Sequence, residues 1–325
     1  MILRHALRAA LLVGASIATS AFTPANATGY PDHTVKLIVS LPPGSAADNT
    51  ARFLSKHLSD RFKQTFVVEN KPGANSFIAA QAVIASPPDG YTLFVSTNSP
   101  VTTNAAVFKN LPYDPIKDFT PIASVARFPM VLVVGEDSPF KTMADLVAAA
   151  RKSPGKLNFG TSTATYQANL ELFNEMNGIR ATHVPYKGTS AALTDLAGGV
   201  LQYSLADVSA VMPLIRGGKL RPLGVGSPGR LKDLPDVPTM QESGNKGYEA
   251  FAWSAVFGPA KMDPAIVKTL SDAIADLLKQ PQSVEFLATL GAEPFPGTPE
   301  SLGKFQASEL ETMRGVVQRA NMQQE

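Results

Sequence analysis

Residues 40–52, S-L-P-P-G-S-A-A-D-N-T-A-R, connect an apolar run, V-K-L-I-V, to an amphipathic segment, Ala47–Phe62. The apolar run predicts a buried strand, and the spacing of apolar residues in the amphipathic segment predicts a helix. Small residues between a strand and a helix leave the first N–H groups of the helix accessible, and their partial positive charge favours an anion. The stretch therefore indicates an α/β fold with a cradle for an anion at a strand end.

Strands and helices alternate at short spacing beyond this stretch, as is typical of βαβ units with mainly parallel strands. Strands are predicted at 35–40, 65–70, 91–96, 119–127, 129–135, 181–186, 201–207 and 220–226, with a short one inside 154–162. Helices are predicted at 47–62, 75–86, 142–152, 166–178, 190–199, 208–218, 263–280, 284–291 and 300–320. The C-terminal helices have little sheet of their own and are expected to pack on the first unit. Two α/β lobes are therefore predicted, with chain crossings near residues 130 and 250.

The first 27 residues predict a secretory signal peptide rather than part of the fold. Arg4 and Arg8 precede a short apolar core, and Ala25-Asn26-Ala27 forms a cleavage signal, so cleavage is expected after Ala27. An uncleaved membrane anchor is the alternative, which the short apolar core disfavours. The chain has no cysteine, so an exported protein of this size must rely on its core and not on disulfides. A location in the periplasm is predicted.

The charge balance disfavours nucleic acid as a partner. The chain has 29 Lys and Arg against 27 Asp and Glu, and loss of Arg4 and Arg8 with the leader makes the two totals equal. Domains that bind nucleic acid carry a basic excess instead.

Residues that catalysis requires are sparse. Beyond the leader the histidines are His33, His57 and His183, which lack metal-ligand spacing, and without cysteine a zinc site is not expected. The sequence G-T-S-T-A at 160–164 lacks the last glycine of a nucleophile elbow. The sequence G-V-G-S-P-G at 224–229 resembles a dinucleotide fingerprint, but prolines follow where its helix should begin. No catalytic residue, metal or cofactor is therefore predicted.

Three loops at predicted strand ends are rich in serine, threonine and small residues, namely 42–48, 96–100 and 160–165. In open α/β sheets, ligands bind beyond the carboxyl ends of the strands, where helix N-termini offer free N–H groups. One such loop alone is most simply a helix cap, but three loops on two lobes favour a binding cleft. Asp48 could face the ligand or cap its own helix, and the cap is favoured, whereas Asp207, at a strand end, is the better candidate to face the ligand.

Seven motifs occur along the chain in a characteristic order. They are V-K-L-I-V-S-L-P-P-G-S-A-A-D-N-T-A-R (35–52), V-V-E-N-K-P-G-A-N (67–75), S-P-P-D-G-Y-T-L (86–93), L-P-Y-D-P-I-K-D-F-T-P-I-A (111–123), H-V-P-Y-K-G-T-S-A-A-L-T-D-L (183–196), L-P-D-V-P-T-M-Q-E-S-G (234–244) and G-A-E-P-F-P-G-T-P-E (291–300). In sequence and spacing the set resembles the Bug-type solute receptors, the periplasmic binding proteins of tripartite tricarboxylate transporters. One departure lies in the first loop, where Ser45 replaces the second glycine of the usual P-P-G-G.

The resemblance implies a two-lobed periplasmic binding protein, a type II Venus flytrap with two mainly parallel sheets and a hinge. Domain I would comprise residues 28–129 and 252–325, and domain II residues 130–251. A small di- or tricarboxylate or aromatic carboxylate would bind between the lobes, and the receptor, expected to be a monomer, would deliver it to the large and small integral membrane subunits of the transporter. The positions that match the family's ligand-binding loops are Ser45, Ala46, Ala47, Ser96, Thr97, Asn98, Thr161, Ser162, Thr163, Thr165 and Asp207.

Two other functions stay open at this point. An exported serine hydrolase would use Ser162 or another loop serine with His183, and a sensor would bind its carboxylate and signal through a membrane kinase. The choice of ligand is open too, because an aliphatic acid needs polar donors in the second lobe. An aromatic acid needs a flat apolar slot, which Leu41, Tyr166 or Phe251 could form.

Overall fold

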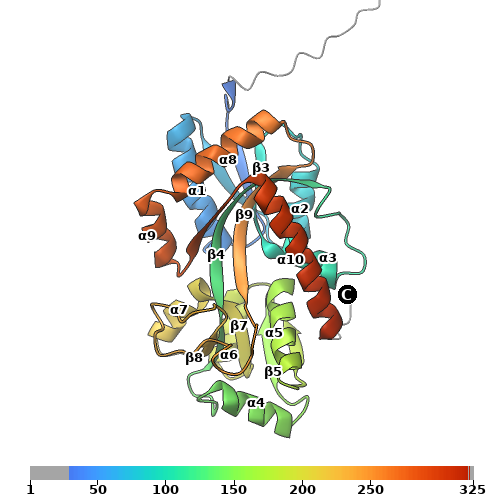
Figure 1. Cartoon of the computed structure of the whole chain (residues 1–325), viewed down its shortest axis with the longest axis vertical. Coiled ribbons are helices and arrows are strands. Elements are labelled where there is room, and N and C mark those ends of the chain that lie inside the picture. The colour runs from blue at the N-terminus through green and yellow to red at the C-terminus, as the bar shows by residue number, and fades with distance from the viewer. Residues whose placement is uncertain (1–28, 321, 323–325) are drawn as a thin grey trace, which may run out of the picture.

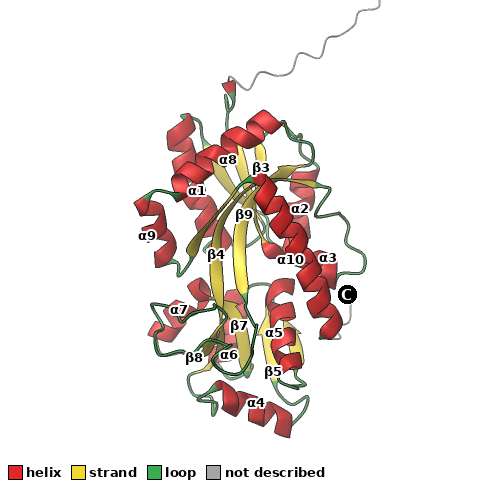
Figure 2. Ribbon diagram, viewed as in Figure 1, coloured by secondary structure: helices red, strands yellow, loops and turns green. Residues whose placement is uncertain are grey.

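One ten-stranded sheet runs through the whole molecule (Figure 2), in the order β2-β1-β3-β9-β4-β7-β5-β6, with β8 and β10 also paired to β4. Its strands are β1 (Val35–Val39), β2 (Phe66–Asn70), β3 (Thr92–Thr97), β4 (Phe119–Gly135), β5 (Asn158–Thr161), β6 (Thr182–Pro185), β7 (Tyr203–Asp207), β8 (Leu220–Val225), β9 (Phe251–Pro259) and β10 (Glu293–Gly297). The computed structural model describes residues 29–320 and residue 322, so the predicted signal peptide lies outside the described residues.

Helices cover the sheet in two lobes stacked along the long axis of the molecule (Figure 1). They are α1 (Ala46–Phe62), α2 (Phe77–Ile84), α3 (Asn104–Val107), α4 (Met143–Lys152), α5 (Ala164–Met176), α6 (Thr189–Ala197), α7 (Val208–Arg216), α8 (Pro264–Leu278), α9 (Pro281–Thr289) and α10 (Pro299–Arg319), with short helical turns η2 (Ala74–Ser76) and η3 (Ser99–Thr103). The last helix, α10, runs from the first lobe to the side of α5 in the second. None of the helices in the described part of the chain has the length and apolarity to cross a bilayer.

Strand direction differs between the ends and the centre of the sheet. The outer strands are parallel as predicted, in the sets β2-β1-β3 and β6-β5-β7. The central strands β4 and β9 run antiparallel to each other and to every other strand that pairs with them. The centre of the sheet is therefore antiparallel, and the predicted parallel arrangement is found at its two ends.

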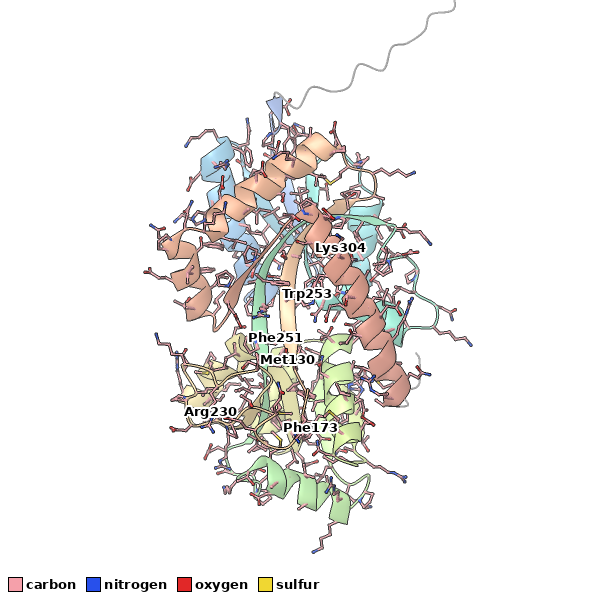
Figure 3. The ribbon with its side chains drawn as sticks, viewed as in Figure 1. Met130, Phe173, Arg230, Phe251, Trp253 and Lys304 are labelled. Carbon is pink, nitrogen blue, oxygen red and sulfur yellow. The ribbon has the colours of Figure 1, made fainter. Side chains whose placement is uncertain are left out.

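The strand β4 is continuous where the sequence predicted two strands, 119–127 and 129–135. It pairs with β9 from Phe119 to Pro129, and its partner changes at Met130, which pairs with Asp207 of β7. Pro129 does not break the strand, although a proline cannot donate a ladder hydrogen bond. Figure 3 shows Met130 and Phe251 at the level where the two lobes meet. One strand thus belongs to both lobes, and the lobes are joined by the backbone of β4 and β9.

Alternating side chains divide the first-lobe sheet into two buried faces. Leu37 and Val39 lie on the face that α1 and α8 cover, in an apolar cluster that continues into the second lobe as far as Phe173. Ile38 belongs to the cluster on the opposite face, together with α2 and Trp253. The cluster that contains Leu37 and Val39 is the larger of the two. It extends along this face of the sheet from the start of α1 to β7.

The first loop is fixed by a network around Asp48, as the sequence indicated. Ser45 caps α1 by accepting a hydrogen bond from the Asp48 N–H at 3.2 Å. The buried Asp48 carboxylate accepts from the Gly44 N–H (2.9 Å), Arg52 Nε (2.9 Å) and Asn70 Nδ2 (3.0 Å). Burial by itself would raise the pKa of Asp48, but the hydrogen bonds from Arg52, Gly44 and Asn70 outweigh it and hold the pKa below its usual value. Asp48 is therefore a structural residue that ties the loop to β2, but the cap of α1 is Ser45 and not Asp48, the residue that the sequence predicted.

Replacing Asp48 by asparagine should destabilise the fold. Three donors face the Asp48 carboxylate, and an amide offers one acceptor oxygen and turns its own N–H₂ towards a donor, which costs about 1–3 kcal/mol. Because the folded-state pKa is lowered, this stability is present above the unfolded-state pKa of ~3.9 and is lost as the pH falls through the folded value. Urea unfolding of D48N at pH 7 and pH 3 should show a larger gap from the native chain at pH 7 than at pH 3. The control is D236N, at an exposed position; an equal loss in both variants would contradict the role of Asp48.

Candidate functional site

The first-lobe site residues lie on adjacent strand ends. The last residue of β1, Val39, pairs with Val95 of β3, so the loop that holds Ser45 emerges beside the end of β3. Ala46 is the first residue of α1 and Ala47 is buried beneath it. Ser96 and Thr97 end β3 and Asn98 follows it, and the Asn98 side chain donates to the Phe251 carbonyl at 3.2 Å. The two predicted loops of this lobe therefore meet at one edge, next to the strand that crosses to the second lobe.

The second-lobe loop, 160–165, ends β5 and begins α5. Thr163 caps α5 by accepting from the Tyr166 N–H at 3.3 Å, and Ser162 Oγ is hydrogen-bonded to Thr189 Oγ1 at 2.8 Å. Thr161 Oγ1 lies 2.7 Å from His183 Nε2. The loop is thus held by hydroxyl contacts to neighbouring strands and helices, with the N-terminus of α5 at its end.

A buried hydroxyl cluster joins this loop to the first lobe. Thr165 Oγ1 lies 2.9 Å from Ser99 Oγ and 2.8 Å from Thr103 Oγ1, and all three side chains are buried. Ala164 and Ala168 of α5 pack beside it in an apolar cluster with α3 and α10. The predicted residue Thr165 is therefore a contact between the lobes, at one side of the cleft.

Asp207 stands at the end of β7, where it caps α7. Its carboxylate accepts from the Ala210 N–H at 3.2 Å, from the Ser209 hydroxyl, and from the Tyr166 hydroxyl at 2.5 Å. Burial, followed by the negative charge of Asp207, raises the pKa of Tyr166 far above its usual value, so the phenol stays protonated and donates. Tyr166 is therefore a polar partner of Asp207 and not the free aromatic wall that the sequence suggested.

His183 and Ser162 do not form a catalytic pair. His183 Nε2 is engaged by Thr161, whereas the hydroxyl of Ser162 is bonded to Thr189. Burial lowers the pKa of His183 to about 4, so the ring is neutral near pH 7. The hydrolase hypothesis therefore lacks its nucleophile–base contact. Among the described residues, no group of three or more acidic, histidine or cysteine side chains could hold a metal.

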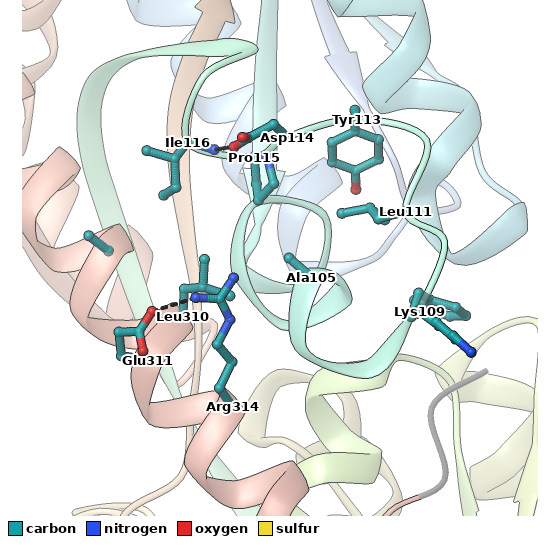
Figure 4. A pocket seen from close by; sticks show the side chains of 12 residues that line it. Ala105, Lys109, Leu111, Tyr113, Asp114, Pro115, Ile116, Leu310, Glu311 and Arg314 are labelled. Carbon is teal, nitrogen blue, oxygen red and sulfur yellow. Dashed lines mark hydrogen bonds and ion pairs between the residues drawn. The ribbon is translucent and has the colours of Figure 1, made fainter.

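A narrow space of about 50 Å³ remains between the lobes, and Asn75 and Phe108 line it from the first lobe and 161–164 from the second. Larger hollows lie elsewhere among the described residues, including one of about 660 Å³ beside Lys109 and Val317. One of about 470 Å³ (Figure 4) lies between α10 and the segment after α3, where Arg314 is paired with Glu311. Another of about 400 Å³ lies beside Trp253, and Asn98 is its only predicted site residue.

Some residues of this region were not singled out from the sequence. Asn75 and Ser76 both have left-handed backbone angles, with φ of 49° and 73°, and the Asn104 side chain donates to the Asn75 carbonyl. Such angles strain residues other than glycine and are common near binding sites. The sequence signal was weak, because P-G-A-N reads as an ordinary turn. Ser99 and Thr103 were missed too, since only the tertiary contact with Thr165 reveals them.

Replacing Thr165 by valine should weaken the contact between the lobes. Valine keeps the shape but leaves the buried hydroxyls of Ser99 and Thr103 without this partner, which costs about 1–3 kcal/mol. Urea unfolding of the native chain and of the T165V variant measures the loss in the free energy of unfolding. The matched control is Thr269→Val on the exposed side of α8, which should change the free energy of unfolding by much less; equal changes would show that the cluster adds no stability.

Comparisons with known proteins agree with this architecture. Residues 50–322 match the family model described as the tripartite tricarboxylate transporter family receptor. The protein BugT of Bordetella pertussis is 35% identical over 310 residues, which cover 94% of this chain and 95% of BugT. A protein of Pseudomonas sp. (strain P51), encoded in the tcbD-tcbE intergenic region, is 33% identical over 316 residues, 95% of this chain and 94% of its own.

Solved structures give the same result. An R. palustris protein with adipate superposes with a TM-score of 0.87 at 34% identity, covering 90% of this chain and 99% of that one. MatC from Rhodopseudomonas palustris with bound malate superposes with a TM-score of 0.83 at 29% identity, and the match covers 89% of this chain and 100% of MatC. The periplasmic binding protein BugD superposes with a TM-score of 0.84 at 28% identity, and the match covers 91% of this chain and 100% of BugD. The chain belongs to the tripartite tricarboxylate transporter receptor family, whose Bug-type members are solute-binding receptors and not enzymes.

Proposed function

We propose that this protein is a periplasmic solute-binding protein that captures a small carboxylate between its two lobes and delivers it to a tripartite tricarboxylate transporter. Family membership supports the receptor role, and the adipate and malate bound by two relatives support a carboxylate as the ligand. The ligand class is a di- or tricarboxylate or an aromatic carboxylate.

The observation that carries this proposal is the meeting of helix N-termini and hydroxyl groups at the boundary between the lobes. The starts of α1 and α5 follow the ends of β1 and β5 and are capped by the neutral side chains of Ser45 and Thr163, whereas the start of α7 is already occupied by the Asp207 carboxylate. Helix N-termini favour a carboxylate through free N–H groups and the helix dipole. The proposed ligand-binding residues are Ser45, Ala46, Ala47, Ser96, Thr97, Asn98, Thr161, Ser162, Thr163, Thr165 and Asp207.

The proposed division of the chain follows the crossing strands, with domain I at 28–129 and 252–325 and domain II at 130–251. The change of partner of β4 between Pro129 and Met130, and the start of β9 at Phe251, support these boundaries. A hinge at these positions lets the second lobe rotate while both lobes keep their own packing. The ligand drives closure by binding the closed form more tightly than the open form.

The proposed location and partners follow from the leader and the family. Residues 1–27 are proposed as a signal peptide cleaved after Ala27, and the partners are the large and small integral membrane subunits of the transporter. The receptor is proposed to act as a monomer. A role in sensing for a membrane kinase would use the same site and differ only in the partner.

The mature chain, residues 28–325, should be stabilised by at least one acid in a thermal-shift panel of adipate, malate, citrate, glutamate, benzoate and phthalate. A ligand at 100 times its dissociation constant adds about 2.7 kcal/mol of stability, which gives a clear shift in Tm. Mass spectrometry of the recovered acid checks that it is chemically unchanged. Turnover of the acid by the native chain that the S162A variant abolishes would restore the hydrolase hypothesis. No shift from any acid, with protein shown to be free of co-purified ligand, would contradict the carboxylate assignment.

Small-angle scattering should detect the hinge motion. The acid that binds should lower the radius of gyration of the mature chain, because it favours the closed arrangement. A formate control at the same ionic strength should leave the radius unchanged. An unchanged radius under saturating ligand would count against the clamshell mechanism while leaving binding itself intact.

A further inference from the structure

Two buried hydroxyl groups at the end of the first-lobe sheet have no hydrogen-bond partner among the described residues. They are Thr97 Oγ1 on β3 and Ser254 Oγ on β9. The Ser254 side chain is 1% exposed. A buried hydroxyl without a partner costs free energy, so native proteins usually give it a partner in the protein, an ordered water or a ligand. Ser254 was not among the residues that the sequence singled out.

The two hydroxyls stand opposite each other on one face of the sheet. Thr97 and Ser254 are directly paired across the antiparallel strands β3 and β9, so their side chains point to the same side. Val95 and Val256, the pair two positions earlier, belong to the large apolar cluster that includes Ala47 and Ala51 of α1. Thr97 and Ser254 therefore face the side of the sheet that α1 covers.

Their level along the sheet places them at the proposed site. The last residue of β1, Val39, pairs with Val95, so Thr97 and Ser254 lie two positions beyond the end of β1. The chain leaves the sheet there and returns as the N-terminus of α1. The hydroxyl pair is thus at the end of the sheet where the first N–H groups of α1 begin.

The same face continues to Asp207 in the second lobe. Ser254 also pairs with Ala126 of β4, and four residues along that strand Met130 pairs with Asp207. Four residues of strand span about 13 Å. Ala126 and Met130 belong to the large apolar cluster. The hydroxyl pair and Asp207 therefore mark the two ends of a floor that lies beneath the proposed cleft.

We propose that Ser254 is a ligand-binding residue, and that the Ser254 and Thr97 hydroxyls together donate hydrogen bonds to one carboxylate group of the ligand. This inference rests on the proposed function and names the floor of the same site. Two hydroxyl donors facing the same side match the two oxygens of a carboxylate. Hydrogen bonds to a charged acceptor are stronger than those to neutral groups, so the pair contributes to affinity without a basic residue.

The test measures binding by isothermal titration calorimetry for whichever acid of the panel shifts the Tm of the native mature chain. S254A and T97V should each weaken its binding about tenfold or more. The matched control is S40A. Ser40 is also a buried hydroxyl without a partner among the described residues, but by alternation it lies on the Ile38 face, opposite α1. S40A should bind within twofold of the native chain.

The stability of the ligand-free variants gives a second readout. Since the Ser254 hydroxyl bonds to no described group, S254A should unfold at the same temperature as the native chain or higher. A lower Tm for S254A would show a structural role instead and overturn the inference. Equal affinity of S254A and the native chain, or an equal loss in S40A, would also overturn it and leave the receptor function standing. A native chain that binds none of the acids would contradict the proposed function and this inference together.

Discussion

The pairing of β4 with β9 is the constraint on which both lobes depend. It joins backbone segments as far apart in sequence as Phe119 and Pro259, and it inserts one lobe into the chain of the other. The outer parallel strands and their helices are added on either side of this pair. The lobes are joined by these strands, by the hydroxyl cluster around Thr165 and by the contact of α10 with α5.

The proposed cleft uses neutral groups to hold a charged ligand. The carboxylates of Asp48 and Asp207 are both occupied by donors of the protein itself, Asp48 by Gly44, Arg52 and Asn70, and Asp207 as the cap of α7. What remains for an anion is a set of N–H and hydroxyl groups. A buried cation would itself have to lose its water on closure, and that loss offsets much of its attraction for the ligand. Neutral donors avoid this cost, so closure does not require burying a fixed charge.

Local signals in the sequence were sufficient for the parts of the fold and site that local interactions determine. The cap by Ser45 and the capping box of Thr142 and Asp145 are made by residues a few positions apart, so local sequence determines both. The strand β10 was missed, because E-P-F-P-G contains two prolines, yet it pairs irregularly with β4.

Long-range pairing explains the remaining differences. The antiparallel centre of the sheet could not be read locally, since direction depends on where the chain returns from the second lobe. Ser254 could not be identified from the sequence for the same reason, because only its pairing with Thr97 places it beside the proposed site. The contact of Thr165 with Ser99 likewise forms only when two lobes meet.

The position of β9 between β3 and β4 also affects the order in which the protein can fold. Synthesis delivers the N-terminus first, but β3 and β4 are joined through β9, which is made only after the whole second lobe. The segments α8, β10 and α10 come later still. All three contact β4, and α10 also contacts α5. A nascent chain therefore cannot complete its first lobe until its C-terminal fifth has been made. This delay suits a protein proposed for export, because a chain that has not yet folded can still be threaded through a membrane channel.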